Sequence, residues 1–319
     1  MSKSTSTVAT ASTPNSAFVF VKPHANTAST QNLVRTKLLD AKITILSEKD
    51  ISGPTIDADK LIDQHYYAIA SKATILPASD IPVPTDKFEQ EFGEAWDIVL
   101  KEGRAANAMD ACERLGVDAA GLNAAWGEAE KVVKFGGGFY CGLVKVEGKE
   151  PLYVFNAFFM TMRSKFVGKD DSIHCFEIEW DSSVLSWSDF RNKLLGPTDP
   201  AEAPATSIRR TIFETYRELG LKSAPNKGDN GVHASASPFE GLAEKANWLG
   251  IDIANDTFGR ALIAGGLSPE TIKEWSVDPR VEQPGGAGKG SVFDALEDTD
   301  AEECLAKLVE LNGLNSGDE

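Results

Sequence analysis

The chain has 319 residues, of which 42% are apolar and 25% are charged, and its formal net charge is -16. This apolar content is typical of a folded globular protein and excludes a disordered polymer. The acidic excess argues against partners that present phosphate charge, so we expect no binding to nucleic acid and none to membranes. A small anionic ligand stays possible, because a local group of basic side chains can oppose the overall charge.

The cysteines and the N-terminal segment indicate a cytoplasmic protein. The 4 cysteines are widely spaced and form no Cys-x-x-Cys pair, which is typical of reduced side chains and not of a disulfide framework or a zinc site. No apolar run approaches the roughly 20 residues that a membrane-spanning helix needs. Residues 1–16 are rich in Ser and Thr and lack the apolar core of a secretory signal, so we interpret them as a disordered tail.

Folding is expected to begin at Ala17. Apolar runs and helical spacing predict, in chain order, a strand over 18–21, a helix over 31–40, a strand over 43–46 and a helix over 61–69. Three prolines between 77 and 84 then indicate the start of an insertion at about 77–150. Two apolar segments, 139–146 and 152–159, flank Glu147-Gly148-Lys149 and predict a β-hairpin.

The second half of the chain predicts a strand over 173–180, a helix over 205–219 and a helix that begins at Pro238. Strands and helices in this order indicate an α+β sandwich and not alternating βα units. We therefore expect a tail (1–16), an α+β domain (17–250) that contains the insertion, and a C-terminal extension with an acidic tail (251–319).

Two glycine clusters do not meet the requirements of phosphate-binding loops. In the segment 285–291 the lysine is followed by Gly290 where a P-loop needs Ser or Thr, and no apolar strand precedes it. We interpret 284–290 as a flexible linker. The cluster 136–138 precedes a strand and opens no helix, so it lacks the context for pyrophosphate binding.

His233 is the strongest candidate for a reactive side chain. It lies among small residues, which leave an imidazole nitrogen accessible to a reactant. Glu244 follows on the first turns of the next helix, where a carboxylate could hold the other ring nitrogen and fix the tautomer. This pair is compatible with a histidine nucleophile, and a structural histidine stays open as the alternative.

Five segments in order resemble the nucleoside diphosphate kinases. The segment Asn230-x-x-His233-x-Ser235, with Ala243-Glu244 on the helix behind it, is similar to the segment that carries the phosphorylated histidine in that family. The other segments are Lys22-Pro23 at the end of the first strand, Asp63-Gln64-His65-Tyr66, Arg191 followed by Leu195-Gly196-Pro197-Thr198-Asp199-Pro200, and Thr206-Ser207-Ile208-Arg209. The resemblance covers roughly 17–76 and 172–250.

The resemblance implies a ferredoxin-like fold, with helices packed on the faces of a four-stranded antiparallel β-sheet. It implies that His233 becomes a phosphohistidine, with Ser235 and Glu244 orienting the site. It also implies that the nucleotide-binding residues are Lys22, Tyr66, Arg191, Thr198, Arg209 and Asn230. The neighbouring Arg210 could take the role given to Arg209, and no aromatic side chain is assigned to the base.

The implied activity is transfer of the γ-phosphoryl group from a nucleoside triphosphate to a nucleoside diphosphate, with Mg²⁺ bound through the phosphates. One alternative is a non-catalytic nucleotide-binding or scaffold protein on the same fold. Another is transfer of the phosphoryl group onto a protein partner. The family also implies a possible homo-oligomer.

Overall fold

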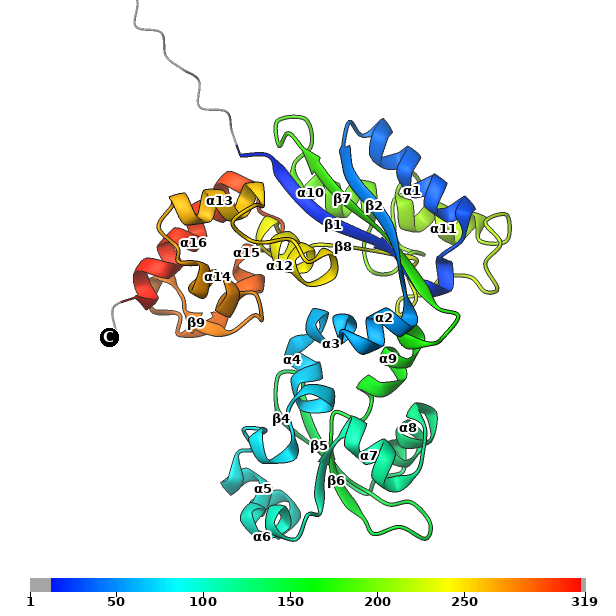
Figure 1. The fold of residues 1–319 in the computed structure, drawn as a ribbon, viewed down its shortest axis with the longest axis vertical. Coiled ribbons are helices and arrows are strands. Elements are labelled where there is room, and N and C mark those ends of the chain that lie inside the picture. Colours follow the sequence, from blue (N-terminus) through cyan, green and yellow to red (C-terminus); the bar gives the residue numbers. More distant parts are fainter. Residues whose placement is uncertain (1–12, 317–319) are drawn as a thin grey trace, which may run out of the picture. The chain divides into compact units, whose positions relative to one another are not determined.

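The computed structural model describes residues 13–316 (Figure 1). The chain forms two compact units: unit 1 comprises Met1–Lys49 and His174–Glu319, and unit 2 comprises Asp50–Ile173. Unit 2 is one continuous segment, and the predicted insertion at 77–150 lies within it. In the described part of the chain, no helix is both long enough and apolar enough to cross a bilayer.

Unit 1 contains a four-stranded sheet in the order β2-β7-β1-β8. The strands are β1 (Asn15–Val21), β2 (Thr44–Ser52), β7 (Ser172–Trp180) and β8 (Val232–Ala234). Strand β1 pairs antiparallel with both β7 and β8. Hydrogen bonds from Ser47 to Glu177 and from Cys175 to Lys49 show that β2 runs opposite to β7.

This strand order is that of a ferredoxin-like domain. Taken as first to fourth in the chain, the strands lie in the order 2-3-1-4, and helices connect the first to the second and the third to the fourth. The predicted fold class is therefore confirmed. Strand β1 begins at Asn15, so the fold starts inside the segment predicted to be a tail; residues 1–12 lie outside the described residues.

The helices of unit 1 differ from the predicted ones mainly at their ends. They are η1 (Pro23–Ala25), α1 (Ala28–Asp40), α10 (Trp187–Asp189), the π-helical turn η4 (Phe190–Leu195), α11 (Ile208–Thr215), α12 (Pro238–Leu249), α13 (Thr257–Ala264), α14 (Pro269–Trp275), α15 (Val292–Leu296) and α16 (Ala301–Asn315).

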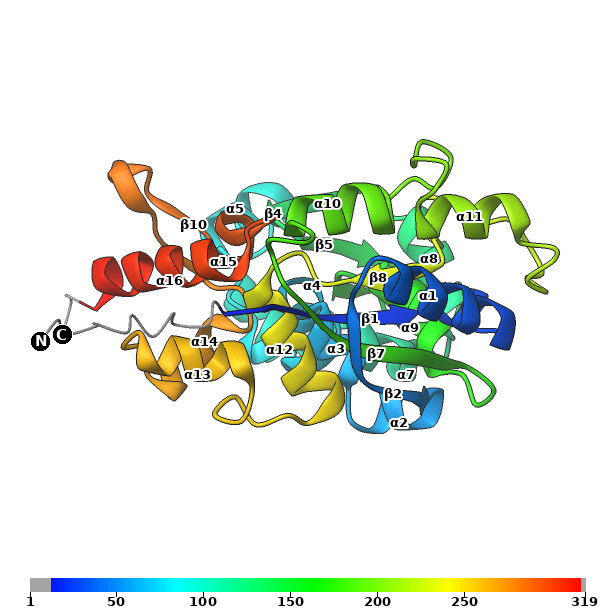
Figure 2. The same ribbon diagram turned by 90° about the horizontal axis from the view of Figure 1, so that it is seen from above.

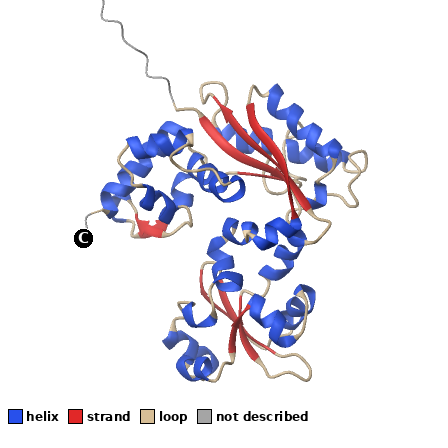
Figure 3. Ribbon diagram, viewed as in Figure 1, coloured by secondary structure: helices blue, strands red, loops and turns tan. Residues whose placement is uncertain are grey.

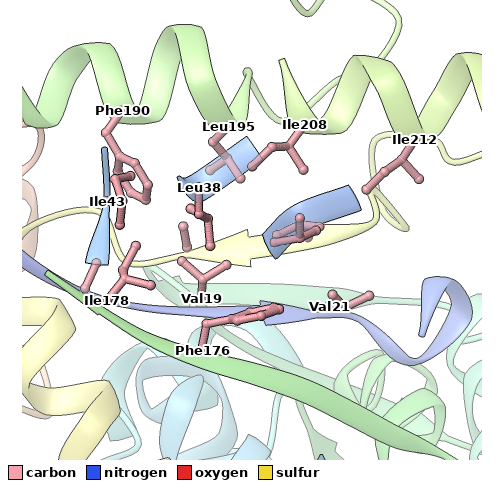
Figure 4. Packing of buried hydrophobic residues seen from close by; sticks show 14 of the residues in the cluster. Val19, Val21, Leu38, Ile43, Phe176, Ile178, Phe190, Leu195, Ile208 and Ile212 are labelled. Carbon is pink, nitrogen blue, oxygen red and sulfur yellow. The ribbon is translucent and has the colours of Figure 1, made fainter. Parts of the chain in front are cut away.

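One face of the sheet is covered by α1, η4 and α11 (Figure 4). Side chains alternate along a strand, so one set of residues from each strand lies in this core. Val19 of β1, Phe176 of β7 and Val232 of β8 are all fully buried there. The opposite face packs against α12, where the ring of Phe18 stacks on Trp248 with centroids 6.1 Å apart.

The C-terminal extension packs on the outer side of α12. Phe239 and Leu242 of α12 share a buried apolar cluster with side chains from α13 to α16. The segment predicted to be a flexible linker, 284–290, instead forms the turn η5 (Pro284–Gly286) and most of β10. Strand β10 (Lys289–Ser291) pairs with β9 (Arg280–Glu282) in a small hairpin beside α16 (Figure 2).

Unit 2 has its own sheet, in the order β3-β6-β5-β4 (Figure 3). Its strands are β3 (Ala105–Asn107), β4 (Val132–Gly136), β5 (Phe139–Val144) and β6 (Leu152–Phe155). The helices are α2 (Gly53–Ala58), α3 (Leu61–His65), α4 (Tyr67–Ala70), η2 (Ser71–Ile75), η3 (Ala78–Asp80), α5 (Thr85–Phe92), α6 (Trp96–Lys101), α7 (Ala108–Leu115), α8 (Ala119–Gly127) and α9 (Phe159–Val167).

The predicted hairpin in this unit is confirmed, because β5 and β6 pair antiparallel. The single helix predicted over 61–69 is wrong. The backbone of Tyr66 has φ -105° and ψ 39°, outside the helical region, and divides the segment into α3 and α4.

Candidate active site

His233 lies on β8, an edge strand of the unit 1 sheet. Its neighbours Val232 and Ala234 are buried in the core on the α1 and α11 side. Alternation along the strand therefore directs His233 to the opposite face, where α12 packs. There its ring stacks on Phe20, the residue paired with it on β1, with ring centroids 4.8 Å apart.

Glu244 of α12 binds the imidazole. Its Oε1 lies 2.6 Å from Nε2 of His233, and the two side chains are 5% and 16% exposed. The other carboxylate oxygen accepts a hydrogen bond of 2.5 Å from the hydroxyl of Ser235. That hydroxyl in turn accepts from the backbone N–H of Phe18 at 3.0 Å. Three residues named from the sequence are thus joined in one hydrogen-bonded chain.

This chain of bonds selects a tautomer. A carboxylate accepts hydrogen bonds, so it favours the proton of the neutral imidazole on Nε2. The in-plane lone pair of His233 then belongs to Nδ1, the nitrogen that can attack an electrophile.

Burial of the imidazole lowers the pKa of His233 well below its ordinary value, and the positive charges of Lys22, Arg209 and Arg191 lower it further. All three cations that were assigned to phosphate therefore lie close enough to act on the same ring. A neutral histidine surrounded by cations suits attack on an anionic phosphoryl group, because only the neutral form is a nucleophile.

Arg209 and Arg210, the two arginines left open by the sequence, have different surroundings. Arg209 is buried, and it donates to the carbonyl of Val232, next to His233, at 2.9 and 3.1 Å. It also donates to the carbonyl of Gly196 at 2.8 Å. Arg210 instead pairs with Glu214, one helical turn later, at 2.6 Å. The structure thus places the Arg209 guanidinium next to the strand that carries His233, and it pairs Arg210 with Glu214; the assignment of either arginine to a phosphate stays a prediction.

Lys22 follows β1 and is the N-cap residue of the short helix η1, and its backbone N–H donates to the carbonyl of Gly231 at 2.9 Å. Asn230 is buried and donates from its amide to the carbonyl of Thr198 at 3.2 Å. Its amide oxygen is buried and has no hydrogen-bond partner within residues 13–316. The hydrogen bond from Asn230 to Thr198 joins the loop that carries Thr198 to the loop before His233.

Gly196 makes this loop possible. Its φ of +92° is a conformation that glycine adopts readily, and a Cβ at this position would lie 2.7 Å from Oγ of Ser207. Since Arg209 binds the carbonyl of Gly196, the position of the guanidinium depends on this turn.

Arg191 has partners that the sequence analysis missed. Its Nη1 donates to Glu297 and to Asp298, both at 2.7 Å. These carboxylates belong to the C-terminal extension, just before α16. No sequence motif identifies these two carboxylates, and the sequence around them shows only a segment rich in acidic residues.

Tyr66 lies in unit 2 at the end of α3. Its predicted contact with a phosphate or with His233 stays a prediction.

The donors near His233 suit phosphate better than a cation held by the protein. Glu244 is bound to His233 and Ser235, and Glu297 is bound to Arg191. The other side chains assigned to the site, Lys22, Tyr66, Arg191, Thr198, Arg209 and Asn230, carry cationic, hydroxyl or amide groups, which match phosphate oxygens. Mg²⁺ retains much of its water, so a nucleotide's phosphates could hold it here without a protein carboxylate.

No protein-family model and no curated protein sequence matches the chain. Among solved structures, it is similar to a nucleoside diphosphate kinase from Encephalitozoon cuniculi, with 13% identity and a TM-score of 0.36 over 75% of this chain and 90% of that one. The corresponding enzyme from Aquifex aeolicus has 12% identity and a TM-score of 0.36, over 73% and 94% of the two chains. An NDP kinase from Pyrobaculum aerophilum has 16% identity and a TM-score of 0.35, over 74% and 95%.

Proposed function

We propose that this protein transfers the γ-phosphoryl group of a nucleoside triphosphate to a nucleoside diphosphate through a phosphohistidine at His233. The observation that carries the proposal is the hydrogen-bonded chain from Ser235 through Glu244 to His233, with three cationic side chains close enough to lower the pKa of the imidazole. The proposed partners are nucleoside di- and triphosphates. The proposed location is the cytoplasm, in keeping with four free cysteines.

In the first half-reaction Nδ1 of His233 attacks the γ-phosphorus. The N–P bond forms as the bond from phosphorus to the bridging oxygen breaks, and the nucleoside diphosphate leaves with that oxygen. The proton stays on Nε2, where Glu244 accepts its hydrogen bond and stabilises the charge that develops on the ring. A second diphosphate then attacks the phosphohistidine and regenerates neutral His233.

The other residues address the phosphates and the sugar. Lys22, Arg191 and Arg209 supply fixed positive charge, and charge placed before the reaction is the main protein contribution to phosphoryl transfer. Thr198 offers a hydroxyl to a phosphate oxygen. The buried amide oxygen of Asn230 offers an acceptor for a ribose hydroxyl. Mg²⁺ would be held by the phosphates and would supply charge neutralisation there.

The test is incubation with γ-labelled ATP, followed by a chase with mixed diphosphates. The wild-type protein should acquire acid-labile phosphate and release it as labelled triphosphate. His233→Ala should abolish the label. His174→Ala is the matched control, because His174 also lies on the unit 1 sheet beside a carboxylate, Glu48, at 3.4 Å. Label that survives in His233→Ala would contradict the proposal.

A non-catalytic nucleotide-binding protein is the second candidate. It is favoured by the two carboxylates on Arg191, which reduce the positive charge available to a phosphate. Purified protein that binds ADP and forms no phosphohistidine would support it.

A further inference from the structure

The segment 297–301 of the C-terminal extension is built into the α+β domain. The backbone N–H of Asp298 donates to the carbonyl of Ala236 at 3.0 Å, in the loop that follows His233. Oδ1 of Asp300 accepts from the backbone of Trp187 and from the amide of Asn15, both at 2.7 Å. Segment 297–301 is therefore held in place beside the loop that follows His233, and it is not a loose tail.

Segment 297–301 binds Arg191 at one end of its guanidinium. Nη1 carries both ion pairs, with Glu297 and with Asp298. Within residues 13–316, Nε and Nη2 of Arg191 make no hydrogen bond. The edge formed by Nε and Nη2 is the fork that binds two oxygens of one phosphate. The carboxylates thus occupy the end of the guanidinium and leave this edge available.

The backbone at Asp298 is also adapted to this contact. Its φ is 62°, in the left-handed region that non-glycine residues seldom adopt. The conformation persists because Ala236 and Arg191 hold the main chain and the side chain of the same residue.

We propose that Glu297 and Asp298 are positioning residues for phosphate binding by Arg191. The proposal rests on the proposed function of the site. A free arginine side chain loses much rotamer freedom when it binds a ligand, and a guanidinium that is already held loses less. The side chains of Arg191, Glu297 and Asp298 are 25%, 52% and 37% exposed. Solvent therefore screens the repulsion between these carboxylates and a phosphate, so orientation outweighs repulsion.

The experiment uses the full chain with Glu297→Gln, Asp298→Gly and both together. Glycine suits the left-handed backbone at 298, so Asp298→Gly removes the carboxylate and keeps the fold. Glu302→Gln is the control for the loss of an exposed acidic charge. Lys42→Gly, at a residue with φ 64°, is the control for glycine in a left-handed position.

Two measurements follow. The dissociation constant for Mg-ADP and the KM for phosphoryl transfer should rise about three- to tenfold in the double variant, as expected for two partly exposed contacts of this kind, and kcat should fall. The rotation of the Arg191 guanidinium, followed by ¹⁵N NMR and assigned with Arg191→Lys, should become faster. The controls should match the wild type in both.

Tighter ADP binding in the double variant would overturn the proposal, because the carboxylates would then weaken nucleotide binding in the wild type. Unchanged binding would also overturn it, because the contacts would then be only structural. Guanidinium rotation that is equally fast in the wild type and the double variant overturns the proposal whatever the activity. A wild type that forms no phosphohistidine, yet shows slow rotation that is released in the double variant together with weaker ADP binding, refutes the proposed function and supports the positioning role.

Chemical rescue gives a further check. Methylguanidinium should restore part of the transfer activity of Arg191→Ala, because Glu297 and Asp298 would hold the added cation. The same compound should not rescue Arg191→Ala combined with Glu297→Gln and Asp298→Gly. Equal rescue in both backgrounds would contradict the proposal.

Discussion

At the scale of single residues, the proton on the imidazole decides whether His233 can react. Glu244→Gln keeps the shape of the carboxylate, but its amide can donate to Nε2 and move the ring proton onto Nδ1. We expect the rate of phosphohistidine formation to fall by up to about 10⁴-fold, the loss known for a catalytic histidine held in the wrong tautomer. Rapid-quench labelling measures the change.

The matched control is Glu240→Gln, one turn earlier on α12. Burial raises the pKa of Glu240 well above its ordinary value, and the charge of Glu244 raises it further. Glutamine keeps the size of this side chain, so this variant should label at nearly the wild-type rate. Equal losses in the two variants would mean that Glu244 has no special role.

The lowered pKa of His233 predicts an unusual pH dependence. The folded protein keeps the imidazole neutral below pH 6.5, where a free histidine would be protonated. Labelling should therefore stay constant from about pH 8 to about pH 6. A rate that falls to half near pH 6.5 would contradict this assignment.

The same shift affects stability. Between the lowered pKa of the folded state and about pH 6.5, the unfolded chain binds a proton that the folded chain does not, so the free energy of unfolding falls as pH decreases through this window. The slope is at most about 1.4 kcal/mol per pH unit from this group. Urea titrations of the wild type and His233→Asn should differ by this slope, and parallel curves would contradict it.

At the scale of elements, the site depends on how closely α12 approaches β1. A Cβ on Gly241 of α12 would lie 2.7 Å from the backbone oxygen of Ser16. Gly241→Ala should therefore displace the helix that carries Glu244. We expect lower stability by about 1–3 kcal/mol, as for overpacking in a core, together with slower labelling.

Gly313→Ala is the matched control, because Gly313 of α16 has open space around its position. There the better helix propensity of alanine should raise stability, by about 0.8–1 kcal/mol. Thermal unfolding of both variants tests the pair. A stabilised Gly241→Ala would show that the contact with β1 is not tight.

The sequence was sufficient to predict the elements whose residues alternate or repeat with a clear period. The run 18–21 is buried in β1 as expected. The edge strand β8 was not predicted, because its three residues are too few to show an alternating pattern. A candidate site could be proposed from the sequence because each of its motifs is local. The contacts of Arg191 could not be predicted, since they join residues separated by 106 and 107 positions and no pattern marks either carboxylate. Likewise, the pairing of β9 with β10 gives structure to a glycine-rich segment that looks flexible in isolation.

At the scale of the whole molecule, the C-terminal extension is part of the folded domain. Lys245 of α12 is almost fully buried, and it pairs with Asp256, which caps α13, and with Ser16 of β1. Asp256→Asn keeps a capping side chain but leaves a buried ammonium without its counter-charge. Removing one partner of a buried pair costs about 3–5 kcal/mol, so we expect a loss of this size in urea unfolding.

Asp252→Asn is the control, because Asp252 is an exposed acid in the same connection between α12 and α13. It should change the free energy of unfolding by less than about 0.5 kcal/mol, as for most surface substitutions. Similar small effects in both variants would show that the extension is only loosely attached to the domain.

Unit 2 is inserted between two strands that are neighbours in the sheet, β2 and β7. Where the chain leaves β2 and where it returns to β7, the backbone N–H of Gly53 donates to the carbonyl of Asp171 at 2.7 Å. Unit 2 therefore begins and ends at the tip of the hairpin formed by β2 and β7. A two-residue Asn-Gly turn could connect the two strands in its place. Polypeptide segments of very different length can therefore replace unit 2 at this tip, by evolution or by engineering. Every strand of the unit 1 sheet would keep its register.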